Sequence, residues 1–152
     1  MEVGPVTGER GTQRWYDADG RLHRSHDLPA VVWLNGAQLW YQHGERHRDG
    51  DLPAVVTADG LQMWYQHGEK HRDGGLPAVV VYGSQFWYQH GRRHRSHDLP
   101  AVVWANGRQE WWVDGTLQSD LDRAQTRRVM AETRRWSALR AAFVGAACTR
   151  AA

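Results

Sequence analysis

The chain has 152 residues, of which 41% are hydrophobic and 24% are charged, and these fractions are those of an ordinary globular domain. No stretch reaches the roughly 20 consecutive apolar residues of a membrane-spanning helix. The net charge of +2 is unevenly distributed, because residues 120–152 hold 7 of the 19 Lys and Arg but only 3 of the 17 Asp and Glu. The rest of the chain is therefore net negative, which argues against nucleic acid as its partner.

Residues 1–14 are polar and glycine-rich, and we expect them to form a flexible segment without a secretory signal. The single cysteine, Cys148, has no partner for an internal disulfide, which is typical of proteins in a reducing compartment. Together these features predict a cytoplasmic protein.

Residues 15–118 are built from a unit of about 24 residues that occurs about four and a half times. The segment Trp40–Val56 returns almost verbatim from Trp64 and again from Trp87. A degenerate copy begins at Trp15 and a truncated one at Trp111. A period of this size predicts a stack of similar small units, each too small to bury its own apolar face.

Turn signals divide each unit into short strands. Asn-Gly, Asp-Gly and His-Gly pairs recur mostly 8 or 16 residues apart, with β-branched and aromatic runs between them. The predicted fold is mostly β, with repeated antiparallel β-hairpins in an elongated, twisted meander sheet and an α-helix after it. The turn glycines of the unit are Gly20, Gly44, Gly68, Gly91 and Gly115.

The turns also predict the register of the strands. A two-residue turn at His43–Gly44 places Trp40 opposite His47, and a two-residue turn at Asn35–Gly36 places Val31 opposite Trp40. Stacked units then align one aromatic row as the core and one histidine row beside it. The aromatic row is Trp15, Trp40, Trp64, Trp87 and Trp111, and the histidine row is His23, His47, His71 and His94. Stacked imidazoles resist simultaneous protonation, so the row predicts a sheet that loosens in mild acid.

A Leu-Pro-Ala link joins each unit to the next, and Asp51–Ala54 is an example. Proline cannot donate to a sheet ladder, so it marks a strand start, and we expect the leucine before it to pack beneath the sheet. Arg48 and Asp51 are three residues apart and are predicted to form an ion pair within their own loop. Alternatively, the arginines of successive loops form a row along one edge that receives phosphate or carboxylate groups.

Residues 119–147 predict a basic amphipathic helix, followed by a short tail at 148–152. Ser119 or Asp120 supplies the N-cap, and apolar residues then follow a 3.6-residue period. The helix could cap the last repeat, dock onto a partner subunit, or lie on an anionic membrane surface. Its predicted contact residues are Arg127, Arg128, Arg134, Arg135 and Trp136.

The Trp/Tyr-x-x-Gly-x-x-His pattern resembles that of MORN (membrane occupation and recognition nexus) repeats, particularly the divergent second type. The resemblance covers residues 15–116 and implies consecutive β-hairpins that make protein contacts or, in some members, associate with membranes. A His-Arg pair and a Leu-Pro-Ala-Val-Val run replace the usual Gly-x-Gly. The unit is similar to uncharacterised repeat proteins of bacteriophages and large DNA viruses, which implies a virion or host cytoplasm. The matching residues are Trp40, Tyr41 and Gly44; Trp64, Tyr65 and Gly68; Trp87, Tyr88 and Gly91; and Trp111, Trp112 and Gly115.

The recurring His-x-x-x-His spacing, as in His43 and His47, would suit a zinc site on a helix. Here Gly44 makes the segment a hairpin, and His43 occupies the turn position that Asp19 and Asp114 occupy in other copies. We therefore predict no metal and no cofactor. Every candidate His or Asp recurs in several units, so none of them has the character of a dedicated catalytic residue.

The sequence thus predicts a non-enzymatic repeat scaffold without a small-molecule substrate. Its partner would be another protein or a second copy of the chain, in an interaction or a structural assembly that includes a viral one. The alternative is a peripheral protein that binds an anionic membrane or another anionic ligand through its arginine-rich helix.

Overall fold

The computed structural model describes residues 2–148, and of these the side chains of Glu9, Thr126 and residues 136–148 are not described. The chain divides into two compact units, Met1–Leu117 and Gln118–Ala152. Among the described residues, the first unit holds all the β-strands and the second holds a single α-helix.

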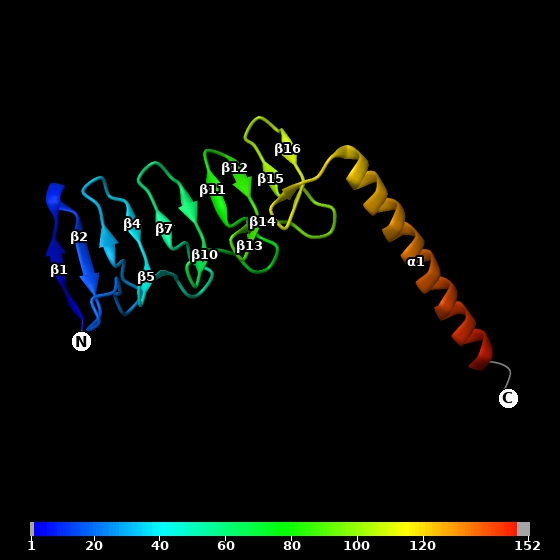
Figure 1. The fold of residues 1–152 in the computed structure, drawn as a ribbon, viewed down its shortest axis with the longest axis horizontal. Helices are drawn as coiled ribbons and strands as arrows, with labels where there is room; N and C mark the ends of the chain where they lie inside the picture. The colour runs from blue at the N-terminus through cyan, green and yellow to red at the C-terminus, as the bar shows by residue number, and fades with distance from the viewer. Residues whose placement is uncertain (1, 149–152) are drawn as a thin grey trace. The chain divides into compact units, whose positions relative to one another are not determined.

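Ten short strands form one antiparallel sheet in the first unit (Figure 1). From β3 onward each repeat supplies two neighbouring strands joined by a tight turn. This arrangement confirms the predicted meander of antiparallel hairpins. The strands, in their order across the sheet, are β1 (Val3–Thr7), β2 (Gln13–Tyr16), β3 (Val31–Val32), β4 (Gln38–Leu39), β7 (Val55–Val56), β8 (Gln62–Met63), β11 (Val79–Val81), β12 (Ser84–Phe86), β15 (Val102–Val103) and β16 (Gln109–Glu110).

Each copy of the unit from Trp40 onward adds a second, separate two-stranded hairpin, so the meander is interrupted once per unit. The interruption falls at the repeat tryptophan: Trp40 lies between β4 and β5, and its N–H donates to the Ala54 carbonyl over 2.8 Å. The second hairpins pair β5 (Tyr41–Gln42) with β6 (Glu45–Arg46), β9 (Tyr65–Gln66) with β10 (Glu69–Lys70), β13 (Tyr88–Gln89) with β14 (Arg92–Arg93), and β17 (Trp112–Val113) with β18 (Thr116–Leu117).

Part of the N-terminal segment, residues 1–14, belongs to the sheet rather than to a flexible arm. β1 pairs with β2, with Val6 opposite Arg14, and the 3-10 turn Glu9–Gly11 (η1) connects the two strands. The first repeat therefore has a neighbour on its N-terminal side.

The predicted turn at His43–Gly44 is confirmed. Both residues have positive φ, 49° and 89°, and Tyr41 lies opposite Arg46. This is the two-residue turn whose twist matches that of the flanking strands. The His47 N–H donates to the Trp40 carbonyl over 3.3 Å, so these two residues also face each other as predicted.

The register predicted from Asn35–Gly36 is wrong by one residue. Val31 lies opposite Leu39, because the turn has three residues rather than two. Only Gly36 has positive φ, and its N–H donates to the Trp33 carbonyl over 2.9 Å. A type I turn followed by one left-handed glycine accounts for this geometry.

The third copy of the unit, which begins at Trp64, is one residue shorter between its proline and the next tryptophan, and it does use a two-residue turn. Tyr82 and Gly83 have φ of 45° and 77°, and Val81 pairs with Ser84. The deletion thus changes the turn type and leaves the pairing of Val79 with Phe86 equivalent to that of Val31 with Leu39.

The core of the first unit lies along the repeat tryptophans. Trp15, Trp40, Trp64 and Trp87 are only 6–8% exposed, whereas Trp111, in the truncated last copy, is half-buried. The alanine of each Leu-Pro-Ala link is fully buried at 0% exposure. An alanine fits here because its carbonyl accepts the N–H of the tryptophan that begins the same repeat, as Ala54 does from Trp40, which brings the two backbones together.

Helix α1 (Asp120–Cys148) forms the second unit and begins where the sequence predicts. The Ser119 hydroxyl accepts the Asp122 N–H over 3.2 Å, and the Asp122 carboxylate accepts the Ser119 N–H over 3.1 Å. This reciprocal capping box satisfies two of the backbone donors that a helix N-terminus leaves open. Within the described residues, no helix is both long and apolar enough to cross a membrane.

We predict that Trp40→Ala lowers the free energy of unfolding by about 3–5 kcal/mol, because it leaves a cavity between two repeats. Urea denaturation followed by circular dichroism measures this loss. Leu34→Ala is the control, since Leu34 is 82% exposed and its truncation should change stability by less than about 0.5 kcal/mol. Equal losses in both variants would contradict the assignment of Trp40 to the core.

Candidate functional site

The loops that follow the second hairpins form a continuous series, and we call residues 23–30, 47–54, 71–78 and 94–101 the link loops. Each link loop places an arginine on the tryptophan of its own repeat. The Arg48 guanidinium carbon lies 3.8 Å from the centre of the Trp40 ring, and Arg24, Arg72 and Arg95 lie 3.7–3.9 Å from theirs. Such close stacking buries the tryptophan face under a cation that the ring attracts.

The same arginine binds the previous link loop. The Arg48 Nε and Nη2 donate to the two Asp27 carboxylate oxygens over 2.7 and 2.8 Å, and its Nη1 donates to the Pro53 carbonyl over 3.2 Å. Arg72 holds Asp51 with the same fork over 2.8 and 2.9 Å. A planar fork on a carboxylate is the geometry for which arginine is suited and lysine is not.

The predicted ion pair within one loop, Arg48 with Asp51, is therefore wrong. The carboxylate of Asp51 faces the next repeat because its backbone is left-handed, with φ of 55°, as is that of Asp27 at 53°. Both partners lie in link loops, and the pairs join residues 21 positions apart. A constant spacing of about one period was the sequence signal that could have identified them.

The tryptophan also contacts the previous link loop through its indole. The Trp40 Nε1–H donates to the Asp27 carbonyl over 3.1 Å, and the bond recurs from Trp64 to Asp51 and from Trp111 to Asp98. Tryptophan, arginine and aspartate thus form one inter-repeat contact, which we call the Trp–Arg–Asp clamp.

The histidines predicted as a row also connect neighbouring repeats. The His47 Nδ1 accepts the N–H of His67, in the next turn, over 3.2 Å, and its Nε2 lies 3.0 Å from the Asp49 carboxylate. His23, His71 and His94 accept the corresponding backbone N–H groups of the following repeats. Each imidazole of the row therefore joins its own link loop to the turn of the following repeat.

The turn histidines stack on the histidine row. The rings of His47 and His67 are 4.8 Å apart, and those of His23 and His43 are 4.4 Å apart. Among the residues that the structure describes, no group of three or more His, Cys, Asp or Glu side chains has the arrangement of a metal site.

Arginine and tyrosine side chains form a further series of contacts along the second hairpins. The Arg46 Nε donates to the Tyr41 hydroxyl over 3.0 Å, and its Nη1 donates to the Tyr65 hydroxyl of the next repeat over 3.4 Å. Arg93 takes the same position near Tyr88 and lies 4.9 Å from the Trp112 ring. These contacts support the stack, and we assign them no ligand.

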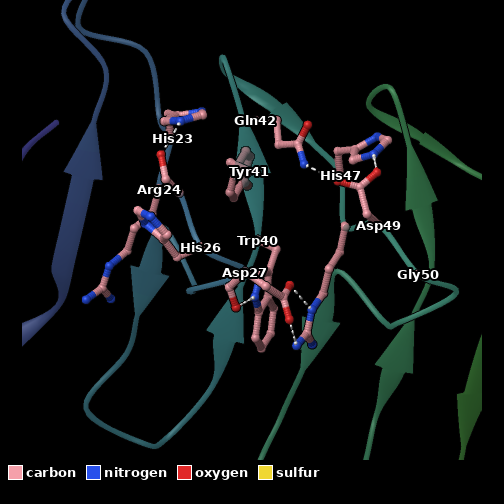
Figure 2. A pocket seen from close by; sticks show the side chains of 12 residues that line it. His23, Arg24, His26, Asp27, Trp40, Tyr41, Gln42, His47, Asp49 and Gly50 are labelled. Carbon is pink, nitrogen blue, oxygen red and sulfur yellow. Dashed lines mark hydrogen bonds and ion pairs between the residues drawn. The ribbon is translucent and has the colours of Figure 1, made fainter. Parts of the chain in front are cut away.

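Pockets lie between neighbouring link loops at three equivalent places. The first, of about 310 Å³, lies between the loops of Asp27 and Asp49, the second of about 190 Å³ lies one repeat further, and the third of about 450 Å³ lies between Arg72 and Arg95. Figure 2 shows the first of them, with Asp27 next to Trp40 and the Gln42 amide directed at Asp49. Sequence reasoning did not identify these pockets, because they need two consecutive loops.

The link leucines are exposed, which corrects the expectation that they pack beneath the sheet. Leu28, Leu52, Leu76 and Leu99 are 44%, 42%, 43% and 44% exposed. The alanine two residues later, 0% exposed in each copy, occupies the buried position instead. The leucines therefore form an apolar row on the surface, which we call the leucine row.

On helix α1, the described side chains of Arg127, Arg128, Arg134 and Arg135 are exposed. Arg128 lies 3.5 Å from Glu132, one turn further along the helix. The side chain of Trp136, which the sequence also assigns to a contact surface, lies outside the described residues.

No protein-family model, curated protein or solved structure matches this chain.

We predict that stability falls as the pH drops below about 4, the ordinary range of Asp, since protonation of Asp27 and Asp51 breaks the clamps. The hydrogen bonds from Arg48 and Arg72 lower the pKa of these carboxyls, so the folded state binds fewer protons than the unfolded state. Their contribution is present above the unfolded pKa and is lost as the pH falls through the folded pKa. Urea denaturation from pH 7 to pH 2.5 measures it.

The double variant Asp27→Asn, Asp51→Asn should be less stable at pH 7 and should lose less stability on acidification. Glu45→Gln removes a carboxylate that is exposed on β6, and it should retain the pH slope of the unchanged protein. If the double variant also retains that slope, the two clamp carboxylates do not contribute to acid unfolding.

Proposed function

We propose that this chain is a non-enzymatic, MORN-like repeat scaffold that mediates protein–protein contact or structural assembly in the cytoplasm or in a virion. The observation that carries the proposal is the leucine row, in which four successive repeats expose the same side chain to nearly the same degree. Apolar rows of this kind on a protein surface are a recurrent feature of interaction sites.

The spacing of the row supports a macromolecular partner. Each repeat adds two strands to the main sheet, and neighbouring strands are about 4.8 Å apart, so successive leucines are separated by roughly 10 Å. Four leucines then extend over about 30 Å. A surface of that length suits another protein chain, or a second copy of this one, better than a small molecule.

The neighbours of the leucines have the composition of an interface. Each link loop also holds an arginine, a residue type enriched among those that dominate binding energy, which stacks on the buried tryptophan of its repeat. Their repetition also supports a non-enzymatic class, because catalysis needs one dedicated set of groups rather than the same set in several copies.

We predict that Leu28→Ser, Leu52→Ser, Leu76→Ser and Leu99→Ser in combination reduce association at least tenfold while circular dichroism and the melting temperature stay nearly unchanged. Light scattering on the full chain measures self-association, and quantitative mass spectrometry after cross-linking in the source cells measures association with other proteins. The matched control is Leu34→Ser with Leu121→Ser, which removes two leucines that are each 82% exposed outside the link loops. A folded variant with the mass and cross-linked neighbours of the unchanged protein would overturn the proposal.

A second candidate function is binding of an anionic membrane through helix α1. The observation in its favour is that Leu121, Val129 and Met130 are 82%, 56% and 49% exposed on the same helix as the four arginines. Exposed apolar and basic side chains together are typical of helices that lie in the interface of a bilayer.

For this second candidate we predict that the protein floats with vesicles of phosphatidylserine and phosphatidylcholine but not with phosphatidylcholine alone. The variant Arg127→Glu, Arg128→Glu, Arg134→Glu, Arg135→Glu should stay with the soluble fraction, because anionic lipid then repels the helix. Its control reverses the charge of Arg92 and Lys70, on the second hairpins. Flotation that is independent of lipid charge would exclude this function.

A further inference from the structure

The third link loop departs from the others at the residue that forms the clamp. Gly75 stands where the neighbouring loops have Asp27, Asp51 and Asp98. The backbone is unchanged, since Gly75 has a φ of 69° and its carbonyl accepts the Trp87 Nε1–H over 2.8 Å. Only the carboxylate is missing.

The arginine that would bind this carboxylate keeps the pose of its equivalents. The Arg95 guanidinium carbon lies 3.8 Å from the centre of the Trp87 ring, and its Nη1 donates to the Pro100 carbonyl over 3.2 Å. Arg48 and Arg72 hold a carboxylate with the Nε and Nη2 edge, whereas among the described residues no carboxylate forms this fork with Arg95. Burial without a carboxylate lowers the pKa of Arg95.

A second substitution removes negative charge from the same place. Ser96 replaces the aspartate that Asp49 and Asp73 supply in the two loops before it. In those loops the aspartate accepts the Gln42 or Gln66 amide over 2.9 and 2.7 Å. The equivalent amide is that of Gln89, which lines the same pocket as Ser96.

The pocket next to Gly75 and Ser96 is larger and less acidic than its two equivalents, as expected from the loss of two aspartates. Its volume is about 450 Å³, against about 310 and 190 Å³ for the others. No Asp or Glu contributes to its lining, whereas Asp27 and Asp49 line the first pocket, and Asp49, Asp51 and Asp73 line the second. The side chains that line it with hydrogen-bond donors include Arg72, Gln89, His94, Arg95, Ser96 and His97.

We propose that this pocket, which we call the Arg95 pocket, binds a carboxylate that takes the place of the missing aspartate side chain. The Arg95 Nε and Nη2 would form the fork that Arg48 and Arg72 form within the chain. A planar carboxylate matches the site better than a tetrahedral anion, because the space is that of an aspartate carboxyl group. Leu76 and Leu99 of the leucine row also line this pocket, but the carboxylate site is defined by Arg95, and its test follows the Arg95 signal rather than association through the row.

The test is a titration of the full chain with sodium acetate, at constant ionic strength with sodium chloride, followed by NMR of the arginine Nε–H signals. The expected result is a saturable shift of the Arg95 signal at millimolar acetate, at least five times the shift that chloride alone produces. A shift that is linear in acetate, or equal to that in chloride, would overturn the proposal.

Matched variants decide whether the missing aspartate makes the site. Gly75→Asp should fill the pocket from within and reduce the acetate response of Arg95 at least tenfold. This variant is expected to fold, because Asp27, Asp51 and Asp98 adopt the same left-handed conformation, and a Cβ at Gly75 meets no atom within 4 Å. Asp51→Gly should create a second, saturable acetate site at Arg72. If Arg95 responds equally in the Gly75→Asp variant, the proposal fails.

Two further probes identify the source of the carboxylate. If N-acetylaspartate methylamide binds more tightly than acetate, the ligand is the acidic side chain of a protein. If the two bind equally, the ligand is a free carboxylate, and either result is consistent with the proposal. Inorganic phosphate that binds more tightly than acetate would overturn the assignment to a carboxylate.

Discussion

The stack depends on the contact that the tryptophans from Trp40 onward make with the link loop of the repeat before them, which forms the complete clamp at Trp40 and Trp64. Most strands here contain only two residues, and isolated hairpins of that size have no independent stability. The indole N–H bonds a carbonyl of the previous link loop, the arginine covers the indole face, and the same arginine holds the previous aspartate. One residue type therefore fills the core while it bonds the adjacent unit, so a repeat has its structure only beside a neighbour.

A clamp between neighbours leaves room for variation within a single repeat. At the left-handed position of the link loop, aspartate closes the contact and glycine leaves it open, and the backbone is the same in both cases. Similarly, the third copy exchanges a three-residue turn for a two-residue turn without a change of register. Local substitutions can thus give one repeat a binding property while its neighbours maintain the sheet.

The surface features have different relations to the fold. The leucines are exposed because the alanine of the same link must approach the backbone of its own repeat's tryptophan, and the rigid proline between leucine and alanine separates the two side chains. The leucine row is therefore a consequence of the way in which repeats are joined, and it extends with every added unit. The Arg95 pocket, in contrast, occurs where this regular pattern is broken, and so it is a candidate for specificity rather than for extended contact.

The sequence by itself determined the period, the antiparallel hairpins, the two-residue turn at His43–Gly44 and the start of the helix at Ser119. These depend on local chemistry: positive φ at a histidine and a glycine, apolar alternation, and a side-chain cap. The sequence could not identify the partner of Arg48, because Asp27 and Asp51 are identical residues at equivalent positions of two link loops. Only the left-handed backbone of the link loop, together with the stacking of one repeat on the next, directs Asp27 to Arg48 and exposes the leucines. Tertiary structure decided every contact between repeats, because in a repeated sequence each residue has equivalent partners one period away.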